Sequence, residues 1–394
     1  MTTEPKRART VLRLVATVIA MPILLAGVPA TATPDTLDGH AIAEHMNAVL
    51  ALGATGIQVR IHYDGGDTTA SAGAAVLGSD ESVPTDGRFR IASITKMFVA
   101  TVVLQLVDER RLALDDLVDR YLPQFGLDSR ITIRMLLNHT SGVANFSSDV
   151  DARGIPYPEL AYDFDHQYRP EELVRYALSK SPLFTPGTRS RYANTNYVLA
   201  AMVIETVTGT PYEQQIADRI LQPLELRQTV TPHASHDVPD PHAHAYMAAL
   251  PLGSPLLDVT LQNPTYLGAS GEMISTTADL VAFLEAVLGG QVLAPDTVDQ
   301  MLTTQPVNVG GIDLVEVGYG LGMMRVDFGD GCVGFGHDGL IAGYASLLFA
   351  SADRRRHIVI SVTGGTIGLD PLHLLPDQVF MSPVRRLAAY LLCG

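Results

Sequence analysis

The sequence predicts an α+β fold, in which an antiparallel sheet made from both ends of the chain is flanked by helices and joined to an all-helical region. Patterns of alternating apolar and polar residues, typical of strands, occur in residues 56–76 and return after residue 318. Between about residues 102 and 302, apolar residues recur at helical spacing and are interrupted by Gly and Pro. Strands at both ends with helices between them predict that the two ends share one sheet.

The first part of this fold begins with a predicted helix over residues 41–52 and a predicted strand over residues 56–63. Asp64-Gly65-Gly66-Asp67 then predicts a hairpin turn, because Gly and Asp accept the backbone conformations that tight turns need. A second strand is expected near residues 70–76.

The middle of the chain is expected to be mostly helical, and the final part returns to strands. The predicted helices cover residues 102–109, 114–121, 171–178, 197–207, 214–221, 278–288 and 295–302. Residues 144–170 contain scattered Asp, Tyr and Pro without a period, which predicts a surface loop or insertion. Later strands and a closing helix are expected at residues 319–328, 333–337, 344–349, 357–362 and 382–392.

These elements predict two domains after an N-terminal leader. Residues 33–105 and 313–394 would form the sheet domain, and residues 106–312 the mostly helical domain. A cleft at the seam between them is the natural place for a binding site.

The leader, residues 1–32, has the pattern of a secretory signal peptide. Four basic residues precede the apolar run 14–30, and Ala30-Thr31-Ala32 matches the small residues of a cleavage site. We therefore expect cleavage after Ala32 and a secreted protein on the cell-wall side, without a stable membrane anchor. An uncleaved anchor is the alternative that this pattern leaves open.

Composition and charge favour an acidic globular enzyme over a nucleic-acid-binding protein. The 394 residues are 47% hydrophobic and carry a formal net charge of −15, so no basic stripe is present to neutralise phosphates. Only three lysines occur, Lys6, Lys96 and Lys180. We expect a monomer with a small-molecule substrate and no nucleic-acid partner.

Two cysteines, Cys332 and Cys393, lie in the part of the chain that export would place in an oxidising compartment. An even number of cysteines there favours a disulfide that ties the C-terminus to the body of the protein. Two separate buried thiols are the alternative.

The segment Phe89-Arg90-Ile91-Ala92-Ser93-Ile94-Thr95-Lys96 carries the first candidate catalytic pair. If a helix begins near Ser93, Lys96 lies one turn later on the same face, beside the hydroxyl. A lysine whose pKa is lowered can take the proton of a serine nucleophile. An isolated Ser-x-x-Lys is also common at ordinary helix starts, so further motifs must decide.

Those motifs are Arg191-Tyr192-Ala193-Asn194 and Gly336-His337-Asp338-Gly339. Together with Ser93 and Lys96 they make the chain resemble the serine β-lactamase and penicillin-binding protein superfamily. It resembles most closely the class C branch and the secreted D-alanyl-D-alanine carboxypeptidases of actinomycetes. Further matching pieces are Leu136-Leu137-Asn138-His139-Thr140-Ser141-Gly142, Phe184-Thr185-Pro186-Gly187, Tyr319-Gly320-Leu321-Gly322, Gly343-Tyr344 and Cys393-Gly394.

The resemblance implies the β-lactamase/DD-peptidase fold and a role for each motif residue. Ser93 would form the acyl-enzyme, and Lys96 and Tyr192 would share its proton, with cations at Lys96 and His337 lowering the pKa of the phenol. Asn194 would hold the substrate amide. The backbone N–H groups of Ser93 and Leu340 would form the oxyanion hole.

The His337-Asp338-Gly339 strand would bind the substrate. Gly339 would let the substrate backbone pass close by, and the charge of His337 would vary near neutral pH. Asp338 departs from the hydroxyl residue that relatives use for a substrate carboxylate. An aspartate at about 5 Å would oppose a carboxylate by roughly 3 kcal/mol at an effective dielectric near 20. Arg325 is the candidate compensating cation.

Other chemistries are less well supported by the sequence. The histidine-rich stretch with His233, His236, His242 and His244 could bind zinc, but its prolines make it irregular and the resemblance needs no metal or cofactor. His139 is interpreted as a structural loop residue. The absence of a Gly-x-Ser-x-Gly motif disfavours an α/β-hydrolase.

The predicted function is that of a secreted, metal-independent serine hydrolase, with D-alanyl-D-alanine carboxypeptidase as the leading activity on cell-wall peptides. A class C-like esterase or β-lactamase acting on esters or β-lactams is the alternative. A penicillin-binding sensor that is acylated without turnover also stays open.

Overall fold

The computed structural model describes residues 37–147, 166–248, 255–309, 312–364 and 377–394. The predicted signal peptide lies outside this part of the chain. So does most of the predicted loop 144–170. Residues 37–394 belong to a single unit, and the proposed division into two domains stays a prediction. None of the helices in the described segments is both long and apolar enough to span a membrane.

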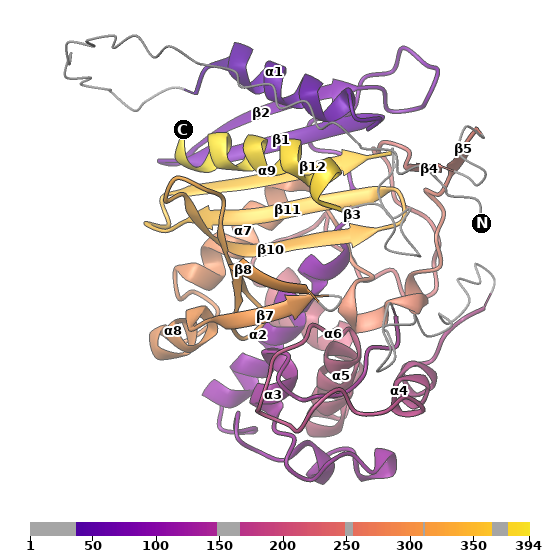
Figure 1. Ribbon diagram of the computed structural model, residues 1–394, viewed down its shortest axis with the longest axis vertical. Coiled ribbons are helices and arrows are strands. Elements are labelled where there is room, and N and C mark those ends of the chain that lie inside the picture. The colour runs from indigo at the N-terminus through magenta and orange to yellow at the C-terminus, as the bar shows by residue number, and fades with distance from the viewer. Residues whose placement is uncertain (1–36, 148–165, 249–254, 310–311, 365–376) are drawn as a thin grey trace, which may run out of the picture. The chain divides into compact units, whose positions relative to one another are not determined.

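The fold is α+β, as predicted, and is organised around an antiparallel sheet (Figure 1). Its strand order is β2-β1-β12-β11-β10-β9-β8-β7, so strands from the two ends of the chain meet where β1 pairs with β12. The strands are β1 (Gly56–Tyr63), β2 (Gly66–Gly73), β7 (Gln305–Val309), β8 (Ile312–Tyr319), β9 (Met324–Asp327), β10 (Val333–Ile341), β11 (Tyr344–Ser351) and β12 (Arg356–Thr363).

Both faces of the central strands are covered. All eight residues of β11 are buried, which explains its nearly continuous apolar sequence. On one face pack α1 (Gly39–Leu50) and α9 (Asp377–Cys393), which Figure 1 shows in front of the sheet. On the other face lies α7 (Thr277–Leu288), whose first turn is capped by the Thr276 hydroxyl.

The helical region is built around α2 (Thr95–Asp108) and α5 (Thr195–Thr208), which pack against each other. Both are apolar around nearly their whole circumference, as expected for helices inside a core. The surrounding elements are α3 (Ile133–Leu137), α4 (Pro170–Leu178), α6 (Tyr212–Ile216), α8 (Pro295–Leu302) and the strand pairs β3 (Phe89–Arg90) with β6 (Ile274–Ser275) and β4 (Tyr246–Ala248) with β5 (Leu256–Asp258).

Two predicted elements were wrong. Residues 114–121 form no α-helix and contain only a short 3₁₀ turn, Val118–Arg120. Residues 319–328 do not form one strand, because the chain leaves the sheet at Gly320-Leu321-Gly322 between β8 and β9. A Cβ on Gly320 would lie 2.1 Å from the Met301 carbonyl oxygen, and Gly322 has a φ of +83°, so both positions require glycine.

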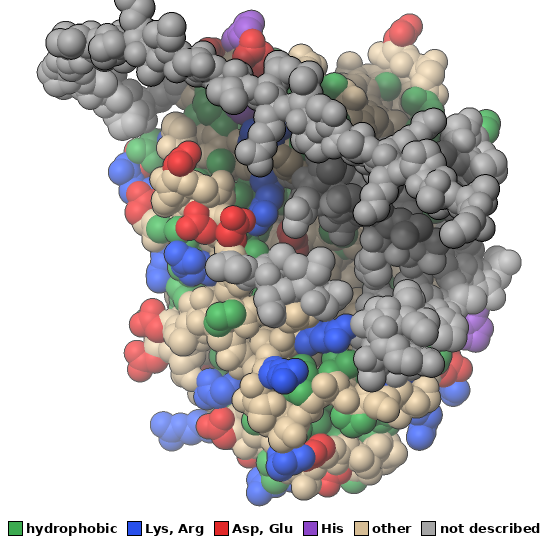
Figure 2. Space-filling view, viewed as in Figure 1, with side chains coloured by type: hydrophobic (Ala, Val, Ile, Leu, Met, Phe, Trp, Pro, Cys, Tyr) green, Lys and Arg blue, Asp and Glu red, His purple; other side chains and the backbone are tan. Residues whose placement is uncertain are grey.

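The C-terminal helix is tied to the sheet by a disulfide between Cys332 and Cys393, which are 61 residues apart. Cys332 directly precedes β10, and Cys393 ends α9. On the face shown in Figure 2, acidic and basic side chains are interspersed over the described surface.

Candidate active site

The segment that leads into α2 places Ser93 and Lys96 together. Ser93 lies in a 3₁₀ turn, Ala92–Ile94, and Lys96 lies in the first turn of α2. Lys96 Nζ is 2.8 Å from Ser93 Oγ. Ala92 has a φ of 45°, a strained left-handed conformation for a residue with a side chain. This bend turns the chain from β3 into the helix.

Lys96 is fully buried, and its ammonium group has little compensation for the loss of water. Nζ donates to the Ser270 carbonyl oxygen at 2.6 Å and lies 4.9 Å from the centre of the Tyr192 ring. Burial lowers the pKa of Lys96 well below its usual value, and the negative charge of Asp338 opposes this only in part. A neutral Lys96 amine can accept the proton of the Ser93 hydroxyl.

Tyr192 lies directly before α5 and is held by β7, because its N–H donates to the Asn308 carbonyl oxygen at 2.8 Å. Burial raises the pKa of the Tyr192 phenol well above 10, although a hydrogen bond with Ser93 opposes the shift. The expectation that nearby cations lower this pKa was therefore wrong. The two shifts favour a protonated Tyr192 phenol beside a neutral Lys96 amine, and a protonated phenol can donate a proton.

His337 is fully buried on β10. Its Nδ1 bonds to the Asp338 carbonyl oxygen, and its Nε2 lies 2.9 Å from the Tyr319 hydroxyl. A carbonyl oxygen can only accept, so Nδ1 carries the proton and Nε2 accepts from Tyr319. Burial is the main cause that lowers the pKa of His337 to about 3. The expectation of a charge that varies near neutral pH was wrong.

The second half of β10 forms an edge beside Ser93. Strand β9 pairs only with Val333 to Gly336, so it does not cover Asp338, Gly339 or Leu340. A Cβ on Gly339 would lie 2.2 Å from the Ile91 carbonyl oxygen, two residues before Ser93. Gly339 therefore allows β10 to pack closely on the Ser93 turn. This contact explains the glycine without the expected close approach of a substrate backbone.

Asp338 and Asn194 are the polar site residues that β10 and the segment before α5 contribute. The Asp338 carboxylate is about 40% exposed, and its charge acts on both Lys96 and Tyr192. The Asn194 side-chain amide donates to Ser147 Oγ at 2.9 Å. Its Oδ1 is buried and has no hydrogen-bond partner in the described part of the chain, so it could accept from a substrate N–H.

Arg325 is not brought into this group. On β9 it lies opposite Phe335 of β10 and Gly318 of β8, inside the sheet. Among the described residues, no hydrogen bond or ion pair joins Arg325 to Asp338 or Ser93. The role of Arg325 as a compensating cation for a substrate carboxylate therefore stays a prediction.

Three groups at this site were missed in the sequence. They are the Ser270 carbonyl, which accepts from Lys96, the Tyr319 hydroxyl, which donates to His337 Nε2, and the ring of His139, which lies 4.3 Å from the Tyr192 ring. His139 and Tyr319 stand in motifs that the sequence already singled out. Their contacts could not be read there because they join segments far apart in the chain.

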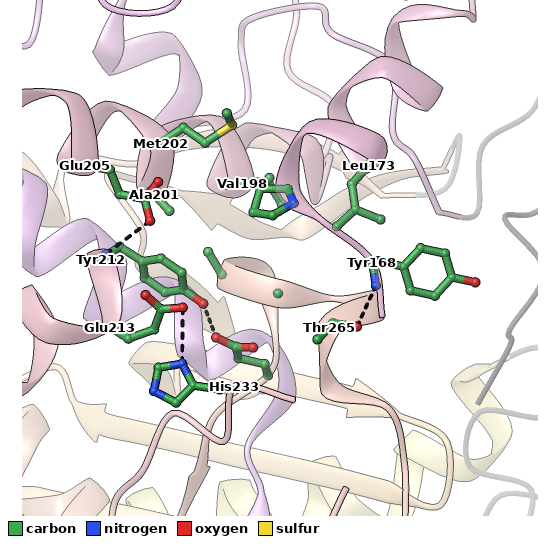
Figure 3. A pocket seen from close by; sticks show the side chains of 14 residues that line it. Tyr168, Leu173, Val198, Ala201, Met202, Glu205, Tyr212, Glu213, His233 and Thr265 are labelled. Atoms are coloured by element: carbon green, nitrogen blue, oxygen red, sulfur yellow. Dashed lines mark hydrogen bonds and ion pairs between the residues drawn. The ribbon is translucent and has the colours of Figure 1, made fainter. Parts of the chain in front are cut away.

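A cavity of about 200 Å³ lies outside this group of residues, between α4, α5, α6 and the segment that precedes β6 (Figure 3). Its wall includes Gly268, Ala269 and Glu272, so it shares a segment with Ser270. Glu272 bonds to the Tyr212 hydroxyl, and burial raises the pKa of Glu272 to about 8. The polar groups of this cavity are satisfied mainly by one another.

The histidine-rich stretch does not assemble a metal site within the described segments, where no group of three or more His, Cys, Asp or Glu could hold a metal ion. His233, His242 and His244 each lie beside a different carboxylate. The partners are Glu213 at 3.6 Å, Asp240 at 3.0 Å and Asp258 at 2.7 Å.

Comparison with known proteins agrees with this geometry. A model of the family described as Beta-lactamase matches residues 41–371. Penicillin-binding protein 4 of Amycolatopsis lactamdurans is 28% identical over 320 residues, which cover 74% of this chain and 76% of that protein.

Two solved structures are similar to this chain over most of their length. A D-stereospecific amidohydrolase from a Streptomyces species is 35% identical, with a TM-score of 0.74 over 88% of this chain and 98% of that one. D-amino acid amidase from Ochrobactrum anthropi SV3, complexed with L-phenylalanine amide, is 26% identical, with a TM-score of 0.75 over 89% and 97%. Since the family match spans well over half of the residues, this chain belongs to the beta-lactamase family, among the serine hydrolases of the β-lactamase and penicillin-binding protein superfamily.

Proposed function

We propose that this serine hydrolase works through an acyl-enzyme on Ser93, with Lys96 as the proton acceptor and Tyr192 as the proton donor. The observation that carries the proposal is the 2.8 Å distance between Lys96 Nζ and Ser93 Oγ in a site whose burial favours a neutral amine. Ser93 Oγ would attack the substrate carbonyl carbon while its proton moves to Lys96 Nζ.

The tetrahedral intermediate would then lose its leaving group with a proton from Tyr192. The raised pKa of the Tyr192 phenol suits it as a donor to a leaving nitrogen or oxygen. The proton held by Lys96 would return to Tyr192, which restores both groups. Water would then attack the acyl-enzyme, and its proton would follow the same route in reverse to Ser93 Oγ.

The remaining site residues would bind and orient the substrate. The backbone N–H groups of Ser93 and Leu340 are the proposed oxyanion hole, since β10 packs directly on the Ser93 turn. Asn194 Oδ1 would accept from the N–H of the acyl part. Asp338 would lie near the leaving group, where its negative charge disfavours a carboxylate.

For the substrate we propose amides of D-amino acids. Similarity to the D-stereospecific amidohydrolase and the D-amino acid amidase supports this class. The neutral His337 and the carboxylate of Asp338 also fit a substrate whose leaving group is uncharged better than one whose leaving group carries a terminal carboxylate. D-alanyl-D-alanine carboxypeptidase is the second candidate, supported by similarity to penicillin-binding protein 4.

The test is release of ammonia from D-phenylalanine amide and of D-alanine from a peptide ending in D-alanyl-D-alanine, with the L-amide and Ser93→Ala as controls. Hydrolysis of the D-amide alone supports the first candidate, and D-alanine release supports the second. Full activity of Ser93→Ala would contradict the acyl-enzyme mechanism. Intact-mass measurement after addition of benzylpenicillin separates a sensor, which keeps a lasting adduct, from a β-lactamase, which hydrolyses the drug.

We also propose that the protein is exported and loses residues 1–32. The basic and apolar pattern before Ala32 supports this, as does a disulfide, which forms in oxidising compartments. Intact mass of the protein recovered from the culture medium of an expressing host tests the proposal. A mass that still includes residues 1–32, or retention in the cytoplasm, would contradict it.

A further inference from the structure

We propose that His139 is a positioning residue that holds the Tyr192 phenol in place for proton transfer to the leaving group. The inference rests on the proposed function, because that function assigns proton donation to Tyr192. Its structural basis is a set of contacts between His139 and the segment around Tyr192.

His139 bonds to the residues on both sides of Tyr192. The Arg191 N–H donates to the His139 carbonyl oxygen at 2.9 Å. The Ala193 N–H donates to His139 Nδ1 at 3.2 Å. The backbone and the side chain of His139 therefore hold the residues before and after Tyr192, which fixes the orientation of the Tyr192 side chain.

The imidazole ring also packs against the Tyr192 ring itself. Their centroids are 4.3 Å apart, and the same imidazole lies 4.5 Å from the Tyr319 ring and 5.4 Å from the Tyr197 ring. His139 is fully buried among these three phenols. The Tyr192 ring is thus supported on the side that His139 occupies, while Lys96 Nζ lies 4.9 Å from its centre.

The tautomer of His139 follows from its partners. Nδ1 accepts from the Ala193 N–H and lies 3.1 Å from the Asn196 side-chain nitrogen. It must therefore be unprotonated, and the proton of the neutral ring lies on Nε2. Burial lowers the pKa of His139 well below its usual value, so the ring stays neutral and adds no charge to the site. The His139 ring accepts a hydrogen bond from the Ala193 N–H and packs against the Tyr192 ring.

The backbone of His139 limits which residues can replace it. Its φ of 61° is left-handed, a conformation that Asn tolerates better than most residues with a side chain. The Oδ1 of an asparagine can also stand where Nδ1 accepts. His139→Asn therefore keeps the acceptor and the backbone, whereas His139→Leu removes the acceptor.

The experiment compares an amide substrate with the p-nitrophenyl ester of the same acyl group, because p-nitrophenolate leaves without a proton donor. If His139 positions Tyr192, His139→Leu should lose about 100-fold in kcat/KM on the amide, the scale of a general acid, and less than about 5-fold in kcat/KM on the ester. The comparison uses kcat/KM because this ratio reports formation of the acyl-enzyme and leaves out its hydrolysis, which is common to both substrates. His139→Asn should recover most of the amide activity, and KM should change little. If His139→Leu does not fold, His139→Gln, with its acceptor displaced, takes its place.

Tyr192→Phe is the reference for the inference. The double variant His139→Leu/Tyr192→Phe should be no slower on the amide than Tyr192→Phe alone, because both changes remove one function. Equal losses of amide and ester activity in His139→Leu, or additive losses in the double variant, would overturn the role of His139. If Tyr192→Phe itself spares the amide, the proposed role of Tyr192 fails first, and the inference fails with it.

Discussion

At the scale of the residue, protonation is decided by desolvation. Lys96, Tyr192 and His337 each lose water on folding, and burial is the largest cause of the pKa shift of all three. Each shift favours the neutral form, downward for the amine and imidazole and upward for the phenol. These shifts favour a neutral acceptor beside a neutral donor, which the proposed proton transfer from Ser93 to the leaving group would require.

The pH profile of the enzyme follows from these shifts. Lys96 must be neutral to accept a proton, so kcat/KM should rise with pH through the lowered pKa of Lys96 and reach its plateau well below pH 10.5. Because the pKa of His337 is about 3, titration of His337 should not change kcat/KM between pH 5 and 9. His337→Gln should lower the rate but leave the midpoint of the acid limb unchanged. A midpoint that moves by a pH unit or more would show that His337 titrates in the working range.

At the scale of the element, β10 and the Ser93 turn depend on each other. Ser346 Oγ on the neighbouring strand β11 donates to the Ile91 carbonyl oxygen at 3.0 Å, and the Gly339 backbone packs on the same carbonyl. The sheet edge and the start of α2 therefore keep a fixed distance. In the proposed oxyanion hole, this distance would set where a substrate carbonyl lies between Ser93 and Leu340.

Gly339→Ala should separate these two elements. Its Cβ would lie 2.2 Å from the Ile91 carbonyl oxygen, which is too close for any contact, so strand and turn must move apart. We expect kcat/KM to fall by about 100-fold, the scale seen when oxyanion donors are lost, with a lower melting temperature. Gly66→Ala is the control, because its Cβ has only one neighbour, at 3.6 Å. Similar activity in both variants would contradict the prediction.

The segment before β6 carries a second dependence on pH. Burial raises the pKa of Glu272 to about 8, from 4.5 in an unfolded chain. Between these pH values the folded protein holds a proton that the unfolded chain has released, so stability falls as pH rises from about 4.5 to 8. The upper bound of this loss is about 5 kcal/mol for a shift of this size.

Glu272→Gln should remove this pH dependence and keep the hydrogen bond to the Tyr212 hydroxyl. The melting temperature of the variant, compared with that of the unaltered protein, should therefore improve steadily from pH 5 to pH 8. Glu225→Gln is a matched control, because the Glu225 side chain is 73% exposed. A difference that stays constant with pH would mean that Glu272 is ionised throughout.

At the scale of the whole molecule, the two ends of the chain are joined twice. Strand β1 pairs with β12 along its full length, and the Cys332–Cys393 disulfide ties α9 to the start of β10. The active-site strand therefore belongs to a sheet that neither end of the chain forms alone. Its geometry depends on the closing of the fold.

Replacing both cysteines by serine should lower the free energy of unfolding. A disulfide that closes a loop of 61 residues restricts the unfolded chain by about 4 kcal/mol in the loop-entropy estimate. Urea unfolding of Cys332→Ser/Cys393→Ser should show this loss, with kcat/KM at 25 °C within about 2-fold of the unaltered protein. An unchanged unfolding midpoint would contradict a stabilising role for the disulfide.

The sequence by itself determined the features that depend on local spacing. Strand β1 and helices α4 and α8 follow their predicted bounds closely, because hydrophobic period and Pro signals act within a few residues. The short distance between Ser93 and Lys96 is also a local feature, because two residues three positions apart at the start of a helix lie on the same face. The break at Gly320–Gly322 was missed because its cause, the Met301 carbonyl, lies on another element.

Only the tertiary structure decided the charges of the site and the support of Tyr192. The neutral states of Lys96 and His337 come from burial by segments remote in sequence, which a motif does not reveal. The same holds for His139, whose sequence neighbours give no sign that it brackets Tyr192. Spacing along the chain can bring a nucleophile and a base together. Desolvation and long-range packing, which set their protonation and orientation, arise only when the whole chain has folded.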